Sequence, residues 1–410
     1  ASLEHQKKIS RSFFTENPSL NTAIEEQVES SLIPLPQLDP SRSGVVIVGP
    51  WRGLSNDLLS FKESLKKWQS ITRWPIFADP LSGLSIHQPG LISYWELLIQ
   101  SQIKLPKDGL QVLRLGPMPA SRSLHEWLST LGGQQILITE GDQRALDPLQ
   151  LSTQWSHGFA SWLDRMTKAR FLPEKAEVRA SSEFLKCCQL KDRIVGKYLD
   201  EQLPLLGSIN EIVLARWLAR LLPSDIPVML AASSPVRDWL SFAGKEALNR
   251  QCFGFRGASG IDGTLSLGMG LSMALGPAVL ITGDLAMLHD TNGWLHARPK
   301  HPPLVVLLID NGGGGIFRQL DLQTESNQTF EKLFSMPQSV DFIALAETYG
   351  IAYRQVSCLE DLQGALDWGF SNSSPTLIRL STDAVSDAAM RSKMRMELIN
   401  QLADFHHNKL

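Results

Sequence analysis

Short apolar runs rich in β-branched residues alternate with helical patterns along the first part of the chain. The run Val45–Val48 is closed by Gly49 and Pro50, and apolar residues at helical spacing follow from Leu58 to Trp68. This pattern predicts a strand followed by a helix. Further strands are predicted at Pro75–Ala78, Gln111–Leu115 and Gln135–Thr139. Strands that alternate with helices favour a parallel sheet with helices on both faces.

A second block of the same kind follows a charged, helix-prone connector. A helix over Glu211–Leu222 precedes strands predicted at Val228–Ala232, Ala278–Thr282, Leu304–Ile309 and Thr376–Leu380, and a charged helix over Ala388–Ala403 comes last. The predicted fold class is α/β, with two parallel-sheet, three-layer domains. We expect an arm over residues 1–42, an α/β domain over 43–173, the connector over 174–203, a second α/β domain over 204–385 and a terminal helix over 386–410.

Composition and charge narrow the classes of function. The 410 residues are 43% hydrophobic and 20% charged, as is typical of globular proteins. Lys and Arg number 39 against 42 Asp and Glu, so no global basic field attracts nucleic acid or an anionic membrane. No apolar run approaches the roughly 20 residues that cross a bilayer. The four cysteines show neither disulfide-framework nor zinc-site spacing. We therefore expect a small-molecule partner and a reducing compartment.

Two polar residues stand where neighbouring strands are predicted to end. Asp284 follows the strand at Ala278–Thr282 and precedes a helix predicted over Ala286–Arg298, while Asn311 follows the strand at Leu304–Ile309. A carboxylate, an amide oxygen and a backbone carbonyl freed by glycines form a hard oxygen site suited to Mg²⁺, which would bridge the protein to a diphosphate at the helix start. Taken singly, Gly-Asp is also typical of a helix cap and Asn-Gly of a turn. Their separation by one helix and one strand favours the metal site.

This arrangement resembles the diphosphate-and-metal motif of thiamine diphosphate enzymes. In that family an Asp, an Asn side chain and a backbone carbonyl two residues later hold the metal, and the matching positions here are Asp284, Asn311 and Gly313. The resemblance therefore implies thiamine diphosphate and Mg²⁺ or Mn²⁺ as cofactors. It also implies that Gly283 and Leu285, which flank Asp284, contact the cofactor.

Four phrases occur in the order found in one subfamily, the 2-succinyl-5-enolpyruvyl-6-hydroxy-3-cyclohexene-1-carboxylate synthases of menaquinone and phylloquinone biosynthesis. They are Ser233–Asp238, Arg256–Gly263, Gly283–Asp290 and Asn311–Phe317. More faintly, Phe77–Ser82 and Leu115–Arg122 look like the central, Rossmann-like domain of the family. The resemblance implies that 2-oxoglutarate is decarboxylated on the cofactor and that the resulting four-carbon unit is added to isochorismate.

Arginines within these phrases are candidate substrate-binding residues. Arg237 and Arg256 follow predicted strand ends and could hold carboxylates through bidentate guanidinium contacts. An arginine in a polar loop is otherwise a solvated surface residue. Ser233 could donate to a substrate or to the diphosphate, with a Ser-Ser-Pro turn as the plain alternative. By resemblance, Arg122 of the central domain also binds substrate.

Three apolar residues are further candidates. The resemblance implies that Ile261, presented from a glycine-rich turn, props the bent cofactor so that its aminopyrimidine nitrogen approaches the thiazolium carbon. It implies as well that Ile316 and Phe317 form apolar walls over the substrate. Ordinary core packing is the alternative for all three.

One part of the family's site has no counterpart in the sequence. The glutamate that activates the cofactor lies, in the family, on a pyrimidine-binding domain that precedes the central domain, whereas only about forty residues precede Val45. No residue is identified here as that glutamate. We expect a C-terminal portion whose missing domain belongs to a longer protein or to a separate polypeptide. The resemblance implies a homo-oligomer, either a dimer or a tetramer, or a partner carrying this domain, in the cytoplasm or in a plastid.

Two other functions stay open. One is a different thiamine diphosphate enzyme, such as an acetolactate-synthase-like enzyme or an oxo-acid decarboxylase, against which the Arg256–Gly263 phrase argues. The other is a non-catalytic assembly subunit that kept the fold. The intact metal residues argue against that subunit, and the absent glutamate domain argues for it.

Overall fold

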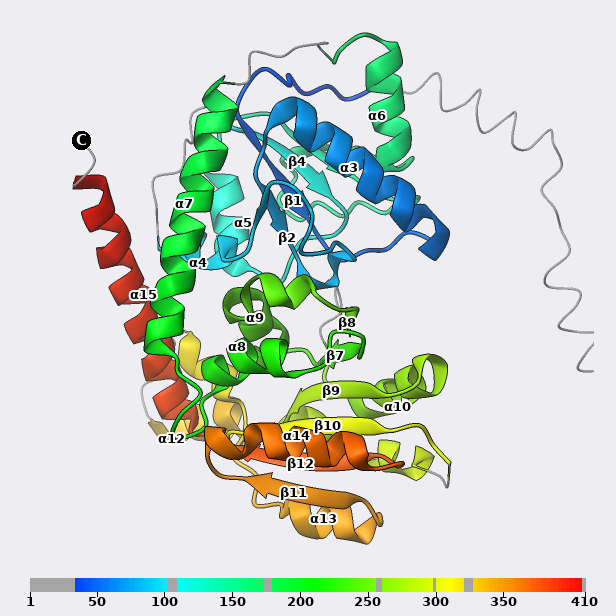
Figure 1. Cartoon of the computed structure of the whole chain (residues 1–410), viewed down its shortest axis with the longest axis vertical. Helices are drawn as coiled ribbons and strands as arrows, with labels where there is room; N and C mark the ends of the chain where they lie inside the picture. The colour runs from blue at the N-terminus through cyan, green and yellow to red at the C-terminus, as the bar shows by residue number, and fades with distance from the viewer. Residues whose placement is uncertain are drawn as a thin grey trace, which may run out of the picture.

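The computed structural model describes residues 34–101, 109–172, 179–255, 260–297, 300–320 and 327–407. These residues form two six-stranded sheets in which every strand pairing is parallel. Helices lie on both faces of each sheet (Figure 1). The predicted α/β fold class with two parallel-sheet domains is confirmed, whereas the domain boundaries stay a prediction.

The first sheet has the strand order β3-β2-β1-β4-β5-β6. The order reverses between β1 and β4, which is the doubly wound Rossmann arrangement. Its strands are β1 (Gly44–Val48), β2 (Ile76–Ala78), β3 (Leu91–Ile92), β4 (Gln111–Leu115), β5 (Gln135–Ile138) and β6 (Ser152–Trp155). Its helices are α3 (Leu58–Thr72), α4 (Trp95–Gln100), α5 (Arg122–Ser129) and α6 (Phe159–Lys168), with 3₁₀ turns at Ser55–Asp57 and Pro80–Ser82.

The second sheet has the order β11-β12-β10-β9-β7-β8, so the order again reverses inside the sheet. Its strands are β7 (Val228–Leu230), β8 (Cys252–Gly254), β9 (Ala278–Gly283), β10 (Leu304–Asp310), β11 (Ala352–Val356) and β12 (Thr376–Ser381). The α-helices around it are α8 (Glu211–Leu221), α9 (Ser234–Phe242), α10 (Thr264–Leu275), α11 (Asp284–His289), α12 (Asn327–Phe330), α13 (Phe342–Thr348) and α14 (Leu362–Ser371). Short 3₁₀ or π turns lie at Gly244–Leu248, Thr291–His296, Gly315–Gln319, Glu331–Ser335 and Leu359–Asp361.

The centre of the second sheet is buried on both faces. Residues Leu304–Leu308 of β10 have no exposed surface, and Ala278–Leu280 of β9 are equally inaccessible. A parallel strand covered on both sides reads as a continuous apolar run rather than an alternating one. This is why the sequence predicts β9 and β10 so directly.

Edge strands and one helix differ from the sequence prediction. The strands β3, β6, β8 and β11 were not predicted, because they lie nearer the sheet edges and are short or partly polar. The single helix predicted over Ala286–Arg298 is wrong. Here α11 ends at His289, and a separate 3₁₀ segment follows at Thr291–His296. The break falls at Asp290, whose carboxylate accepts the N–H and the hydroxyl of Ser266 at 2.6 and 2.9 Å.

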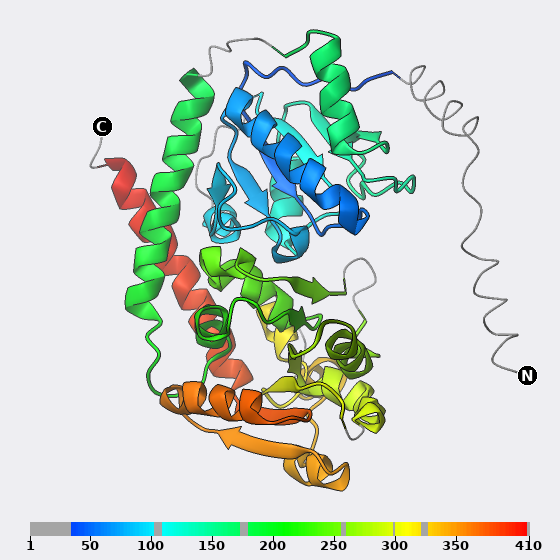
Figure 2. The ribbon, with the colours of Figure 1, turned by 45° about the vertical axis from the view of Figure 1, so that its right-hand side comes forward.

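Two long helices lie beside the sheets, and one of them, α7 (Arg179–Gln202), connects them along the chain. The helix α7 lies within the predicted connector, and α15 (Ala384–His407) is the terminal helix. They run side by side along one flank of the molecule (Figures 1 and 2). Among the described residues, no helix combines the length and apolarity that crossing a membrane requires.

A buried arginine ties the two blocks together. Arg216 of α8 is fully buried and donates to the hydroxyl of Tyr94, next to the first sheet, at 3.1 Å and to the carbonyl of Phe242 at 3.2 Å. It also donates to the carbonyl of Gly196 at 3.1 Å and to the carboxylate of Asp200 at 2.6 Å, both on α7. The guanidinium therefore connects three helices and the start of α4.

We expect Arg216→Met to lower the free energy of unfolding by about 2–4 kcal/mol, because it leaves buried carbonyls without a donor. Arg220→Met is the matched control, since Arg220 shares Asp200 but lies nearer to solvent. Its loss should stay below about 1 kcal/mol. Chemical denaturation of both variants measures the difference, and equal losses would contradict a joining role for Arg216.

Candidate functional site

A cavity of about 300 Å³ opens at the carboxyl ends of β7, β9 and β10. This edge of a parallel sheet is the usual position of ligand sites in α/β folds. Ten of the twelve predicted site residues line the cavity. Of the other two, Arg122 does not line it, and Arg256 lies outside the described residues. Residue Glu211, at the start of α8, lines it as well.

The pairing of β9 with β10 brings the two central polar residues to this edge. Gly283 lies opposite Ile309 in the parallel register. Asp284 is the next residue after Gly283 and begins α11, while Asn311 follows the last residue of β10. The sequence prediction that these side chains leave neighbouring strand ends is therefore met by the geometry.

Backbone N–H groups hold the Asp284 carboxylate. One oxygen accepts from Leu285 at 2.7 Å, and the other accepts from Gly313 at 2.6 Å. Gly313 has φ +132°, a conformation that favours glycine, and a Cβ there would lie 2.1 Å from the carbonyl oxygen of Ser335. The Gly313 carbonyl accepts from the N–H of Gly315 at 2.9 Å, which leaves its second lone pair for another partner.

The Asn311 amide is held from one side. Its Nδ2 donates to Glu211 Oε1 at 2.5 Å. Its Oδ1 is buried and has no hydrogen-bond partner within the described part of the chain. A buried amide oxygen without a donor is costly, and it is an open coordination position for a cation.

Together these donors fit a hard divalent cation. A carboxylate, an unpartnered amide oxygen and a backbone carbonyl with a lone pair to spare are the oxygen ligands that Mg²⁺ and Mn²⁺ accept. The residues that could hold the ion are Asp284, Asn311 and Gly313. The remaining coordination positions would be left for water or for phosphate oxygens of a ligand in the cavity.

Burial changes the acidity of this site. Desolvation, helped by the nearby Asp310 carboxylate, raises the pKa of the Asp284 carboxyl group to about 7 from its ordinary value of 3.8, although the N–H groups of Leu285 and Gly313 oppose the shift. The ionised form of Asp284 is therefore disfavoured in the metal-free chain. A bound cation would reverse this preference, because it attracts the carboxylate.

The start of α9 forms another wall of the cavity. Ser233 precedes this helix with φ 74° and ψ −137°, a sparsely populated conformation for a residue with a side chain, and such strain occurs at functional sites. Arg237 lies in the first turn of α9 and not in the loop that the sequence suggested. Its Nη1 donates to the Ser233 carbonyl at 2.8 Å, and its side chain is exposed at the cavity.

The three apolar candidates line the cavity while only partly buried. Ile261, Ile316 and Phe317 belong to none of the three hydrophobic clusters that the described residues form. Phe317 packs against Phe334 instead, with ring centroids 5.6 Å apart. Their position suits contact with a ligand better than core packing does.

One predicted substrate-binding residue, Arg122, is not brought into the cavity. Arg122 begins α5 beside the first sheet, has an 80% exposed side chain and pairs with Glu126 at 2.8 Å. Arg256 lies outside the described residues.

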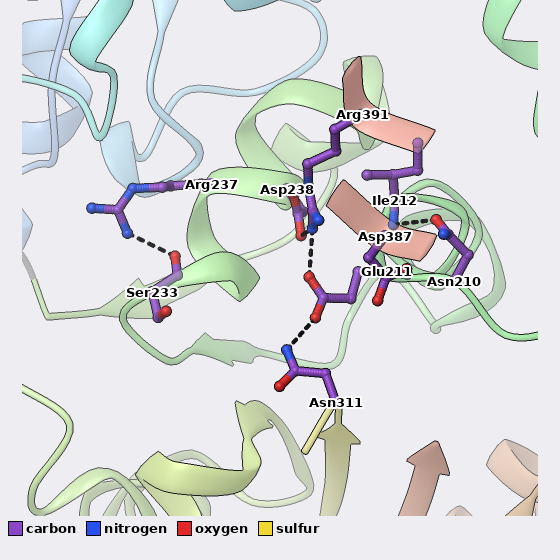
Figure 3. A network of polar contacts seen from close by, with 9 residues as sticks. All are labelled: Asn210, Glu211, Ile212, Ser233, Arg237, Asp238, Asn311, Asp387 and Arg391. Atoms are coloured by element: carbon purple, nitrogen blue, oxygen red, sulfur yellow. Dashed lines mark hydrogen bonds and ion pairs between the residues drawn. The ribbon is translucent and has the colours of Figure 1, made fainter. Parts of the chain in front are cut away.

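Sequence reasoning missed the charged cluster behind Asn311. Glu211 contacts Asn311 on one side and Arg391 of α15 on the other, and Asp238 and Asp387 lie beside them (Figure 3). Along the sequence Glu211 is an ordinary acidic residue in the first turn of a helix, and Arg391 comes 180 positions later. Only the fold brings these charges together.

The chain is similar to known thiamine pyrophosphate enzymes. The family model described as the C-terminal thiamine pyrophosphate-binding domain of thiamine pyrophosphate enzymes matches residues 243–380, which include the candidate metal residues. A curated relative from Prochlorococcus marinus (strain MIT 9313), named 2-succinyl-5-enolpyruvyl-6-hydroxy-3-cyclohexene-1-carboxylate synthase, is 56% identical over 371 residues. A relative of the same name from Synechococcus sp. (strain CC9902) is 48% identical over 396 residues.

Each alignment covers a larger share of this chain than of the relative. The alignment with the Prochlorococcus relative covers 90% of this chain and 64% of the relative, and the one with the Synechococcus relative covers 93% and 67%. The chain thus spans about two thirds of the length of these relatives. A solved structure from Mycobacterium smegmatis, assigned as a thiamin diphosphate-dependent enzyme, superposes with a TM-score of 0.54 at 14% identity, over 83% of this chain and 62% of that one. This last likeness concerns the fold alone.

The acidity of Asp284 predicts how stability depends on pH. The folded metal-free chain holds a proton on Asp284 that the unfolded chain releases near pH 4, so the contribution of Asp284 to the free energy of unfolding falls as the pH rises from about 4 to 7. The Asp284→Asn variant lacks this contribution, so its melting temperature should fall less steeply with rising pH. Over that pH range, we expect its free energy of unfolding to lose about 1–3 kcal/mol less than that of the unmodified chain. Thermal unfolding at several pH values without divalent cations measures both slopes.

The matched control for this experiment is Asp367→Asn, because Asp367 is an exposed carboxylate on α14. The melting temperature of Asp367→Asn should change with pH as steeply as that of the unmodified chain. Equal slopes for the unmodified chain and Asp284→Asn would contradict a desolvated, protonated Asp284.

Proposed function

The chain belongs to the family of 2-succinyl-5-enolpyruvyl-6-hydroxy-3-cyclohexene-1-carboxylate synthases, which are thiamine diphosphate enzymes, and from this premise we propose that it supplies their diphosphate- and metal-binding part. The family predicted from the four sequence phrases is confirmed by these relatives. In the proposed reaction, 2-oxoglutarate loses carbon dioxide and its remaining four-carbon unit is added to isochorismate, in a pathway to menaquinone or phylloquinone.

The observation that carries this proposal is the convergence of Asp284 and Asn311 in one cavity. A desolvated carboxylate and a buried amide oxygen without a partner among the described residues stand at adjacent strand ends. Neither group is well satisfied by the chain alone, and both become satisfied by Mg²⁺ or Mn²⁺. We assign Asp284, Asn311 and the Gly313 carbonyl as the metal ligands.

Thiamine diphosphate, when bound, supplies an electron sink for decarboxylation and carbon–carbon bond formation. Gly283, Asp284 and Leu285 would hold its diphosphate, together with the cation at the proposed metal ligands. Ile261 lines the cavity and would support the ring portion of the cofactor. These residues bind and orient; they do not transfer protons.

Substrate carboxylates need positive charge at the mouth of the same cavity. Arg237 is exposed there, and its guanidinium can form a bidentate contact with a carboxylate. Ser233 can donate a hydrogen bond beside it. Ile316 and Phe317 would exclude water from the reacting groups. By the family resemblance Arg256 and Arg122 add further substrate contacts, although Arg122 would have to act from outside this cavity.

The proposed site is completed by a pyrimidine-binding domain that carries the activating glutamate. The curated relatives are longer than the aligned part of this chain, which leaves room in them for such a domain. In this protein it would come from a further part of a longer polypeptide or from a separate partner. A location in the cytoplasm or in a plastid stays a prediction.

Turnover of 2-oxoglutarate and isochorismate tests the function. The chain is assayed with thiamine diphosphate and Mg²⁺, alone and after addition of a pyrimidine-binding domain from a complete relative. We expect no product from the chain alone. After the addition we expect 2-succinyl-5-enolpyruvyl-6-hydroxy-3-cyclohexene-1-carboxylate. Formation of acetolactate or a free aldehyde would favour another thiamine enzyme. Absence of any product in both assays, together with absence of cofactor binding, would favour a non-catalytic subunit.

We expect Asp284→Ala to abolish metal-dependent binding of thiamine diphosphate, because the carboxylate is the only charged ligand proposed for the cation. Isothermal titration calorimetry of the cofactor, with and without Mg²⁺, measures this. The control Asp367→Ala should bind as the unmodified chain does. Unchanged affinity in Asp284→Ala would remove Asp284 from the metal site.

We expect Arg237→Ala to raise the KM for a carboxylate substrate by several-fold to 100-fold, or about 1–3 kcal/mol, with a smaller effect on kcat. Steady-state kinetics of the completed enzyme give both constants. The control Arg144→Ala removes an exposed arginine that pairs with Asp142 outside the cavity, and its kinetics should not change. Normal KM values in Arg237→Ala would exclude the proposed carboxylate contact.

A further inference from the structure

A buried charged cluster lies directly behind the proposed metal ligand Asn311. Glu211, the first residue of α8, is 2% exposed, and its Oε1 accepts from Asn311 Nδ2 at 2.5 Å. Its Oε2 accepts from Arg391 Nη2 at 2.5 Å (Figure 3). Both carboxylate oxygens therefore accept hydrogen bonds, one from Asn311 at the cavity and one from Arg391 of the C-terminal helix α15.

The chemistry of this contact decides which way the Asn311 amide points. An ionised carboxylate only accepts hydrogen bonds, so the group that faces Glu211 must be the amide nitrogen. Oδ1 is then forced to the opposite side, where it is buried without a partner among the described residues. That orientation is the one a metal ligand requires, because a cation binds the oxygen and not the nitrogen.

Glu211 itself is fixed by α15. Arg391 binds Asp238 through Nε at 3.1 Å and Nη2 at 2.5 Å, and the same Nη2 reaches Glu211. One turn earlier on the same helix, the Asp387 carboxylate accepts the backbone N–H of Glu211 at 3.0 Å. Asn210 caps α8 by accepting from Ile212 at 3.1 Å. The side chain and the backbone of Glu211 are thus both held.

The backbone at Gly315 also lies close to the Asn311 amide nitrogen. A Cβ on Gly315 would lie 2.6 Å from Asn311 Nδ2 and 3.2 Å from the Cβ of Ala384, the first residue of α15. The 3₁₀ turn that contains Gly315 packs on α15. The Asn311 amide nitrogen therefore lies beside both Glu211 and a backbone segment that the same helix supports.

We propose that Glu211 is a positioning residue that orients the Asn311 amide oxygen toward the cation, and that Arg391 of the C-terminal helix holds Glu211 in that role. The inference rests on the proposed function, because it assumes that the cation binds at Asn311. It adds that a helix outside the sheet determines the geometry of the metal site. Outer contacts of this kind typically change metal affinity by 10- to 100-fold.

Glu211→Gln tests this orientation directly. A glutamine has one acceptor and one donor group, and the Arg391 guanidinium takes the acceptor. The amide introduced by this substitution would then present N–H groups to Asn311, which turns the Asn311 oxygen toward them and the Asn311 nitrogen toward the cation position. We expect the dissociation constant of Mn²⁺, measured in the presence of thiamine diphosphate, to rise by about 10- to 100-fold.

The measurement is the free Mn²⁺ signal in electron paramagnetic resonance, recorded for the full chain at fixed thiamine diphosphate. Arg391→Lys is the second variant: it keeps a buried positive charge but cannot contact Asp238 and Glu211 with a planar fork, and a several-fold weaker affinity is expected. Lys393→Met, which removes a 57% exposed side chain on the same helix, is the matched control and should bind as the unmodified chain does. Circular dichroism confirms that each variant is folded.

A double-mutant cycle separates positioning from general structural damage. In the Asn311→Ala background, Glu211→Gln should cause no further loss of Mn²⁺ affinity, because the amide it orients is gone. Should Glu211→Gln fail to fold, Arg391→Lys in both backgrounds decides the question. Affinity within twofold of the unmodified chain in the folded variants, or an equal loss in the Asn311→Ala background, would overturn the inference and leave the proposed function standing. Absence of Mn²⁺ binding in the unmodified chain would overturn both.

Discussion

The in-register parallel pairing of β9 with β10 is the constraint on which the rest of the site depends. Because Gly283 lies opposite Ile309, Asp284 and Asn311 leave the sheet at the same level and on the same edge. A slip of one residue would turn one strand's side chains to the other face of the sheet and separate carboxylate from amide. The apolar residues of both strands are buried on both faces, so the hydrophobic core that stabilises the domain also sets the distance between the two polar groups.

The site gathers groups that are costly to bury. The carboxyl group of Asp284 is desolvated, the amide oxygen of Asn311 lacks a partner among the described residues, and Glu211 and Asp238 share the single guanidinium of Arg391. Burial raises the pKa of Asp238, and the repulsion between carboxylates adds to this shift. A fold selected for stability alone would replace such groups with apolar side chains. Their presence at one strand edge therefore points to a ligand whose positive charge offsets the cost.

Much of the fold could be predicted from the sequence, because it follows from continuous apolar runs. All the predicted strands except β7 match the structure to within one residue at each end, and the α/β class followed from their alternation with helices. The interruption of the helix after Asp284 was not predictable, because it depends on Asp290 reaching Ser266 in another helix. Asp284 and Asn311 could be found from their spacing. The cluster of Glu211 and Arg391 could not, since α15 meets α8 only after the whole domain has folded.

Anomalous diffraction from a crystal of the chain grown with Mn²⁺ and thiamine diphosphate tests the central claim most directly. The account predicts one strong peak in the cavity, with an Asp284 carboxylate oxygen, Asn311 Oδ1 and the Gly313 carbonyl oxygen at about 2.1 Å and with Asn311 Nδ2 still on Glu211. A peak bound by other residues would contradict it. So would a structure in which the Asn311 side chain has turned away from Glu211 in order to reach the metal.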